Sequence, residues 1–244
     1  MSTMAASPTV ARPYRPNRTG DRIFFSLMPV LMWAAVLFGF TRTYFGAGMV
    51  MAPLPNLLIH FHGAAFTLWM VLLVVQTALI STHHVKWHMK LGVAGFCLSV
   101  AMVVLGLLAA VDALRRGSGP LGLDPVTFFV IPTTAILQFS VLVFFAYRLR
   151  RVAEAHKRLI TIATIAIMDA AVGRWPVAIL QQHPPMQDLV ILAFLLLVVF
   201  YDLFSLHRLS KYTMWASLFV VVVHLGRVPL GKTGPWHAVV QHLL

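Results

Sequence analysis

Residues 54–81 read LPNLLIHFHGAAFTLWMVLLVVQTALIS, a run without Asp, Glu, Lys or Arg. About 17–25 apolar residues cross the hydrocarbon core of a bilayer as an α-helix. Six further apolar runs occur, at residues 23–45, 90–112, 126–148, 158–175, 188–206 and 212–228. Because a backbone in lipid must satisfy its own hydrogen bonds, each run is expected to be helical. The sequence therefore predicts an all-α fold, an integral membrane bundle of seven transmembrane helices.

The composition supports this prediction. Hydrophobic residues make up 59% of the chain and charged residues 11%, which excludes a disordered chain and an ordinary soluble domain. The net charge of +12 does not indicate a nucleic-acid partner, since the charges lie in short connections between apolar runs and form no basic groove. Positive residues beside membrane helices mark the cytoplasmic side and attract anionic lipid head groups.

The positions of the basic residues predict the orientation. With the N-terminus in the cytoplasm and seven spans, the cytoplasmic segments hold 13 of the 19 Lys and Arg residues, and the C-terminus lies outside. The cytoplasmic set is Arg12, Arg15, Arg18, Arg22, Lys86, Lys90, Arg148, Arg150, Arg151, Lys157, Arg158, Arg208 and Lys211. The expected organisation is a flexible cytoplasmic tail at 1–21, a transmembrane domain at 22–228 and an outer interfacial tail at 229–244.

Ionisable residues inside a membrane are candidates for function, and they fall into two layers here. The outer layer comprises His60, His62, Asp169, Arg174, His224 and Arg227. His224 and Arg227 share one helical stripe with Thr213, Ser217 and Val220, so both are expected to point the same way. Arg227 or Arg174 is the expected partner of Asp169. This layer is either an outward-opening pocket for an anionic or redox-active ligand, built from His62, His224 and Arg227, or a structural network that fixes helix register.

The inner layer comprises Gln76, His88, His156, Asp202 and His207. His88 and His156 begin two different helices at about the same depth, which suits the two axial positions of haem b. Alternatively, His88, His156, Asp202 and His207 form a transition-metal site. The competing interpretation is that His156-Lys157-Arg158 is an ordinary basic run at the membrane interface.

Several strings resemble a widespread family of uncharacterised bacterial polytopic membrane proteins, over nearly the whole chain from about residue 22. These strings are His62-Gly63 with Phe66, Trp69 and Gln76; His88 with Lys90-Leu91-Gly92; His156-Lys157-Arg158-Leu159; Arg174-Trp175-Pro176; and Tyr201-Asp202-Leu203. The resemblance implies a multi-pass protein of the bacterial cytoplasmic (inner) membrane.

A second resemblance is to the cytochrome b561 and ferric-reductase group, in which pairs of histidines on alternate helices clamp haems. His88 and His156 match one such pair. A second pair needs a partner for His62 on the fourth helix, where the chain offers only Gln138, unless His224 substitutes.

The expected function is binding of haem b or a metal ion, with electron transfer to or from a quinone-like ligand. One alternative is a non-redox membrane enzyme that acts on a lipid or isoprenoid, with Asp169 or Asp202 as general acid and Arg174 as a further catalytic candidate. The other is a membrane protein for binding, transport or assembly that has no chemistry of its own.

Overall fold

The computed structural model describes residues 18–46, 56–119, 123–182 and 185–244, and these residues form helices and no strand. The long helices are α1 (Arg18–Phe40), α2 (Leu57–Ser81), α3 (Val85–Arg115), α4 (Pro125–Arg148), α5 (Ala153–Ala166), α8 (Pro185–Leu206) and α9 (Lys211–Gly231). The shorter ones are a π-helical turn, η1 (Thr41–Phe45), and α6 (Asp169–Val172), α7 (Ala178–Gln182) and α10 (Gly234–Gln241).

Among the described residues, six helices are long and apolar enough to cross a membrane. They are Thr19–Phe45, Leu57–Ser81, Val85–Arg115, Pro125–Arg148, Met186–Leu206 and Lys211–Gly231. The chain is therefore a multi-pass membrane protein, and six of the seven predicted spans have a matching helix. The remaining predicted span, 158–175, differs: it is divided between α5, which has 14 residues, and α6, which has four.

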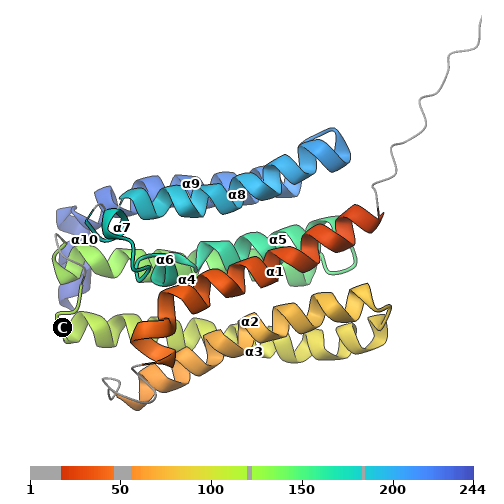
Figure 1. Ribbon diagram of the computed structural model, residues 1–244. Helices are drawn as coiled ribbons and strands as arrows, with labels where there is room; N and C mark the ends of the chain where they lie inside the picture. The colour runs from red at the N-terminus through yellow and green to blue at the C-terminus, as the bar shows by residue number, and fades with distance from the viewer. Residues whose placement is uncertain (1–17, 47–55, 120–122, 183–184) are drawn as a thin grey trace, which may run out of the picture.

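The long helices run antiparallel, and contacts between them define two ends of the bundle (Figure 1). At one end, named the basic end, Lys157 of α5 is ion-paired with Asp21 of α1 (2.7 Å), and Tyr201 of α8 donates to the same carboxylate (2.9 Å). At the other, named the α10 end, Asn56 donates to Asp112 of α3 (2.8 Å). The connections at 82–84, 149–152 and 207–210 all lie at the basic end.

Helix α5 lies in the interior of the bundle and packs against α4, α9, α8 and α1. Its residues from Thr161 to Ala166 are all buried, and Trp69 of α2 donates to the Thr164 hydroxyl (3.2 Å). Because protein surrounds this helix, it can carry polar residues that a lipid-facing helix would expose at a cost of several kcal/mol. Small side chains such as Ala163 and Ala166 allow the neighbouring helices to approach closely.

The chain turns more tightly between α5 and α6. Ile167 N donates to Thr164 O (3.2 Å) and Met168 N to Ile165 O (3.1 Å), which are i→i−3 bonds of the 3₁₀ type. Helix α6 then packs against the end of α1, where a Cβ on Gly39 would overlap the carbonyl oxygen of Ala171. The glycine therefore lets α1 hold α6, and with it Asp169, at a fixed position.

Both predicted tails contain helix. Residues 1–17 lie outside the described part of the chain, but α1 begins at Arg18, within the segment expected to be a flexible tail. At the other terminus α9 continues to Gly231, and α10 packs back on the bundle, with Trp236 Nε1 donating to Val126 O of α4 (2.9 Å). The 229–244 tail is thus an extension of the helical domain.

Candidate functional site

The first polar cluster, at the α10 end, consists of Asp169 of α6, Asp188 of α8, and His224 and Arg227 of α9. Arg227 joins the two carboxylates: Nη1 lies 2.6 Å from Asp169 Oδ2, and Nη2 lies 2.6 Å from Asp188 Oδ1. His224 Nε2 lies 3.3 Å from Asp169 Oδ1. The side chains of Arg227, His224 and Asp169 are 6%, 6% and 11% exposed, whereas that of Asp188 is 40% exposed. Asp188 therefore links a buried cluster to the surface.

Ligand atoms of Asp169, Asp188 and His224 lie within 4.8 Å of one another, the only such group of three or more in the described residues. The guanidinium of Arg227 already provides the cation between the two carboxylates. A divalent metal would have to displace that guanidinium or share its ligands, and leaving an arginine buried without its carboxylates is costly. The geometry thus favours an ion-pair cluster over a metal centre at this place.

The second polar cluster, at the basic end, is centred on Asp202 of α8. Arg158 of α5 holds this carboxylate through Nε (2.9 Å to Oδ1) and through Nη2, and both side chains are almost completely buried. Thr213 Oγ1 donates to Asp202 Oδ2 (2.5 Å), and the backbone N of Ser210 lies 3.3 Å from the same oxygen. With all these donors directed at it, the Asp202 carboxylate is fully engaged in hydrogen bonds, an arrangement that suits a structural role better than that of a general acid.

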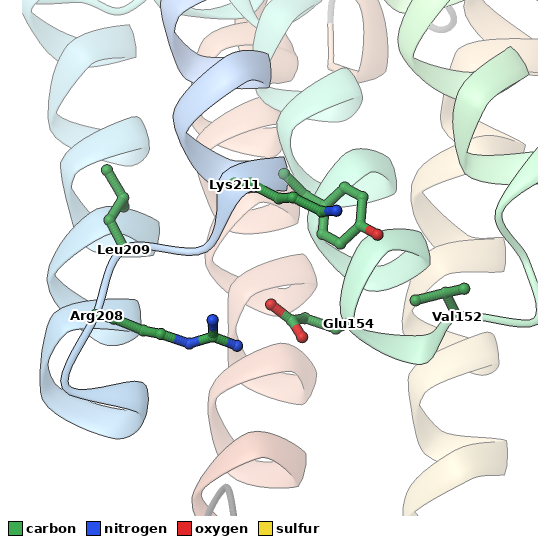
Figure 2. Close-up of a pocket in the computed structure, with 6 residues that line it drawn as sticks. Val152, Glu154, Arg208, Leu209 and Lys211 are labelled. Carbon is green, nitrogen blue, oxygen red and sulfur yellow. The ribbon is translucent and has the colours of Figure 1, made fainter. Parts of the chain in front are cut away.

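A pocket of about 390 Å³ opens beside the second cluster (Figure 2). Its lining residues come from the α4–α5 and α8–α9 connections and from the first turns of α5 and α9; they are Val152, Glu154, Arg208, Leu209, Lys211 and Tyr212. In Figure 2 the side chains of Glu154 and Arg208 point toward one another from opposite sides of the pocket. Glu154 Oε1 also accepts a hydrogen bond from Ser210 Oγ (2.7 Å), so this carboxylate connects the pocket to the residues around Asp202.

The third feature is a histidine pair formed by His88 of α3 and His156 of α5. Their ring centroids lie 6.3 Å apart and their planes are inclined at 83°. His156 Nδ1 lies 2.9 Å from the carbonyl oxygen of Ala146. One orientation of the Gln76 amide gives both its NH₂ group and its oxygen a hydrogen-bond partner. In that orientation the Gln76 nitrogen donates to His88 Nδ1 (2.6 Å) and the Gln76 oxygen accepts from Gly92 N (3.0 Å). Both rings thus use Nδ1 in these contacts. His156 donates through Nδ1 and has Nε2 free for a ligand, whereas a neutral His88 that accepts at Nδ1 carries its proton on Nε2.

Part of the predicted outer layer is confirmed. His224 and Arg227 point together, as the helical stripe on α9 predicted. Of the two partners expected for Asp169, Arg227 is the one that pairs with it. Arg174 is not a partner: it donates to Ala170 O (2.6 Å) and its guanidinium lies over the Phe40 ring.

The two predicted histidines of α2 take no part in the cluster contacts seen at the α10 end. The His62 ring lies against that of Phe66, with centroids 4.3 Å apart and planes inclined at 34°. Its Nδ1 is buried without a hydrogen-bond partner among the described residues. The backbone carbonyl of His60 accepts from Tyr44 (3.4 Å).

The predicted inner layer is divided. Gln76, His88 and His156 lie together, but Asp202 belongs to the second polar cluster with Arg158. His207 is exposed in the α8–α9 connection, where its φ is 51°. The predicted metal ligands were His88, His156, Asp202 and His207. Within the described residues, no three of them bring their ligand atoms close enough together to share an ion.

Two charged members of the polar clusters, Arg158 and Asp188, were missed by the sequence analysis. Arg158 was assigned to a basic interfacial run, although it lies two residues after His156 and therefore on roughly the opposite face of α5. Asp188 was not considered, although an acidic residue in the first turn of a helix after Pro184 and Pro185 is a recognisable signal.

Comparisons of the chain with protein-family models, with curated proteins and with solved structures found no match. The two resemblances described above therefore stay predictions.

Proposed function

We propose that this protein is a seven-span haem b protein of the bacterial cytoplasmic membrane, which transfers electrons to or from a quinone-like ligand. His88 and His156 are the proposed axial ligands. In this proposal the N-terminus lies in the cytoplasm and the C-terminus lies outside.

The observation that carries this proposal is the separation of the two imidazoles. A bond between a metal and a histidine nitrogen is about 2.0–2.1 Å long, so two imidazoles bound to one metal from opposite sides have ring centres roughly 6 Å apart. His88 and His156 lie at 6.3 Å. Metal-bound histidines commonly donate their other N–H to a backbone carbonyl, as His156 does to Ala146.

The small number of protein ligands favours haem over a bare ion. A bare transition-metal ion in a protein needs three or four protein ligands, and in the described residues the pair has no carboxylate or thiolate to complete such a set. Haem brings four nitrogens of its own and requires one or two axial ligands from the protein. A bare metal ion stays the second candidate, because Gln76 adds an amide group beside His88.

Gln76 is suited to control which His88 nitrogen carries the proton. When its amide nitrogen faces Nδ1, the proton of a neutral His88 ring lies on Nε2. With the amide turned over, Gln76 Oε1 accepts a hydrogen bond from a protonated Nδ1, and Nε2 becomes free to bind a metal. Rotation of one amide would therefore accompany cofactor binding.

The proposed quinone-like ligand is placed at the α10 end. Arg227 is buried, yet its Nε has no hydrogen-bond partner among the described residues. A buried guanidinium donor without an acceptor is rare, and a carbonyl oxygen of a ligand would satisfy it.

The seventh crossing is supported by the path of the chain. Helix α8 begins at the α10 end beside Asp169 and ends at the basic end beside Arg158. Since α4 ends at the basic end, α5 and α6 together must connect the two ends, and their 20 residues from 153 to 172 cover about 30 Å. The excess of Lys and Arg at the basic end supports a cytoplasmic location for it.

The test is the visible spectrum and metal content of protein purified in detergent from cells with ample haem supply. We expect a Soret band in the wild type and its loss in His88→Gln and in His156→Gln. The control His84→Gln should retain it, because His84 is an exposed residue that precedes α3. Folded wild-type protein that is colourless and free of metal would overturn the proposal. So would a His88→Gln variant with the wild-type spectrum. A metal without a Soret band would select the bare-ion candidate.

A further inference from the structure

A second cavity lies beside the pocket of Figure 2. It measures about 300 Å³ and shares two lining residues, Lys211 and Tyr212, with that pocket. It lies between α4 and α9, and the buried Leu159 of α5 also lines it. A polar pocket and this groove between two helices therefore adjoin at the basic end of the bundle.

The walls of the groove are apolar and open toward the surrounding lipid. Phe145 of α4 and Trp215 of α9 both line it, and they are 49% and 63% exposed. From Lys211 to Phe219 the groove follows α9 for about 12 Å, close to the depth of one leaflet of a bilayer whose hydrocarbon core is about 30 Å thick. Such walls offer water few hydrogen-bond partners, whereas a hydrocarbon chain needs none. The groove therefore suits an acyl chain.

The pocket next to the groove carries the charges that an anion needs. Arg208 and Lys211 line it, and Figure 2 shows their side chains extending toward the α5 side, where Glu154 lies. Both basic residues are exposed, and in the described part of the chain neither forms an ion pair with a carboxylate. The planar fork of an arginine matches the oxygens of a phosphate group. An anion in the pocket would thus meet two cations that have no carboxylate partner.

The backbone adds to this positive field. Helix α5 begins at Ala153 and α9 begins at Lys211, so the pocket lies at the start of both helices. The first N–H groups of a helix have no acceptor within the helix, and the helix dipole favours negative charge there. Glu154 provides such a charge in the first turn of α5, whereas the first turn of α9 has no acidic residue. The start of α9 therefore favours an external anion.

Glu154 narrows the choice of headgroup. Its Oε1 accepts from Ser210 Oγ (2.7 Å), and a carboxylate has room for further donors. Two cations and one carboxylate leave the pocket with one net positive charge. A phosphodiester followed by hydroxyl groups matches it, because the phosphate supplies one negative charge and the hydroxyls donate to the carboxylate. Ethanolamine and choline headgroups have no net charge, and choline also lacks a donor.

We propose that the pocket and the groove together bind one anionic phospholipid with a hydroxyl-bearing headgroup, for which phosphatidylglycerol is the probe. Its phosphodiester lies between Arg208 and Lys211, and its headgroup hydroxyls face Glu154. One acyl chain lies in the groove beside Phe145 and Trp215. The site contains neither proposed haem ligand, so it stands independently of the proposed function.

The site is tested by native mass spectrometry of delipidated protein titrated with phosphatidylglycerol, phosphatidylethanolamine and phosphatidylcholine of equal chain length. We expect one phosphatidylglycerol to bind about 30-fold more tightly than phosphatidylcholine, the contribution of two basic groups beside an anionic headgroup. The double variant Arg208→Gln with Lys211→Gln alters exposed residues and should lose this preference. The control Lys86→Gln with Lys90→Gln removes two exposed positive charges from α3, outside the site, and should keep it.

The groove is tested separately with glycerophosphoglycerol, which has the same headgroup without acyl chains and should bind far more weakly. Ala216→Leu places a larger side chain at the groove wall and should weaken binding of phosphatidylglycerol, whereas Ala101→Leu at an exposed position of α3 should not. Equal affinity for the three phospholipids would overturn the proposal, as would an unchanged preference in the Arg208→Gln with Lys211→Gln variant. Glycerophosphoglycerol that binds as tightly as the lipid would also overturn it, since the occupant would then be a soluble phosphate ester.

Discussion

The most informative perturbation of the fold is removal of one partner from the buried pair of Arg158 and Asp202. Arg158→Met keeps a long unbranched side chain in place but leaves the Asp202 carboxylate with only Thr213 and the Ser210 backbone as donors. Because both charged side chains are almost completely buried, solvent cannot replace the lost guanidinium.

The expected cost follows from the contacts. Arg158 donates to Asp202 through Nε and Nη2. Hydrogen bonds to charged groups contribute about 1.5–3 kcal/mol each, so two amount to roughly 3–6 kcal/mol. Breaking a buried pair from one side costs about 3–5 kcal/mol, which agrees. The double variant Arg158→Met with Asp202→Leu leaves no unpaired charge and should be less destabilised than either single variant.

The free energy of unfolding can be measured in mixed micelles by titration with a denaturing detergent, for the wild type, the two single variants and the double variant. The predicted result is a strong positive coupling, with the double variant closest to the wild type. The reasoning would be refuted if each single variant lost less than about 1 kcal/mol of unfolding free energy, as expected for an exposed ion pair. Refutation would also require that the two losses simply add in the double variant, without coupling.

Two further predictions concern the elements that position the clusters. Gly39→Ala should destabilise the protein by about 1–3 kcal/mol, because its Cβ overlaps the carbonyl of Ala171, and should lower the thermal midpoint; Gly226→Ala, whose Cβ meets nothing within 4 Å, is the control and should not lower it. Asp124→Ala removes the N-cap of α4, whose Oδ1 accepts from Thr127 N (2.9 Å), and should cost about 0.5–2 kcal/mol at neutral pH. The hydrogen bonds from the Thr127 side chain and backbone hold the pKa of the Asp124 carboxyl below its usual value. The contribution of Asp124 to the free energy of unfolding is therefore complete above the unfolded-state pKa and disappears as the pH falls through the lower folded-state pKa. The difference in unfolding free energy between wild type and Asp124→Ala should shrink in acid. A difference that grows in acid would contradict this.

The helices were largely predictable because their signal is local. Apolar runs longer than about 17 residues can form membrane helices whatever their neighbours do, and six of the seven predicted spans have a matching helix. The interruption between α5 and α6 had no such signal, since residues 153–172 contain neither Gly nor Pro. It depends on tertiary contacts, namely Asp169 with Arg227 and Gly39 with Ala171.

The candidate site was predictable where one helix carried the pattern. The spacing of His224 and Arg227 on α9 predicted their common direction, whereas the partner of Asp169 was left open between Arg227 and Arg174 and is Arg227. The pairing of Arg158 with Asp202 could not be predicted in this way, because it joins residues on α5 and α8 and depends on how the two helices pack. A basic residue next to Lys157 is typical of an interface, and only the fold places it inside the bundle.

The central claim, that His88 and His156 clamp one haem, is tested most directly by low-temperature electron paramagnetic resonance of the oxidised protein. The relative orientation of two axial imidazoles sets the anisotropy of a low-spin ferric haem, and the two rings are inclined at 83°. The account predicts the strongly anisotropic low-spin signal of near-perpendicular imidazoles, lost in His88→Gln and in His156→Gln. The rhombic signal of parallel imidazoles, a high-spin signal or no haem signal from folded wild-type protein would contradict it.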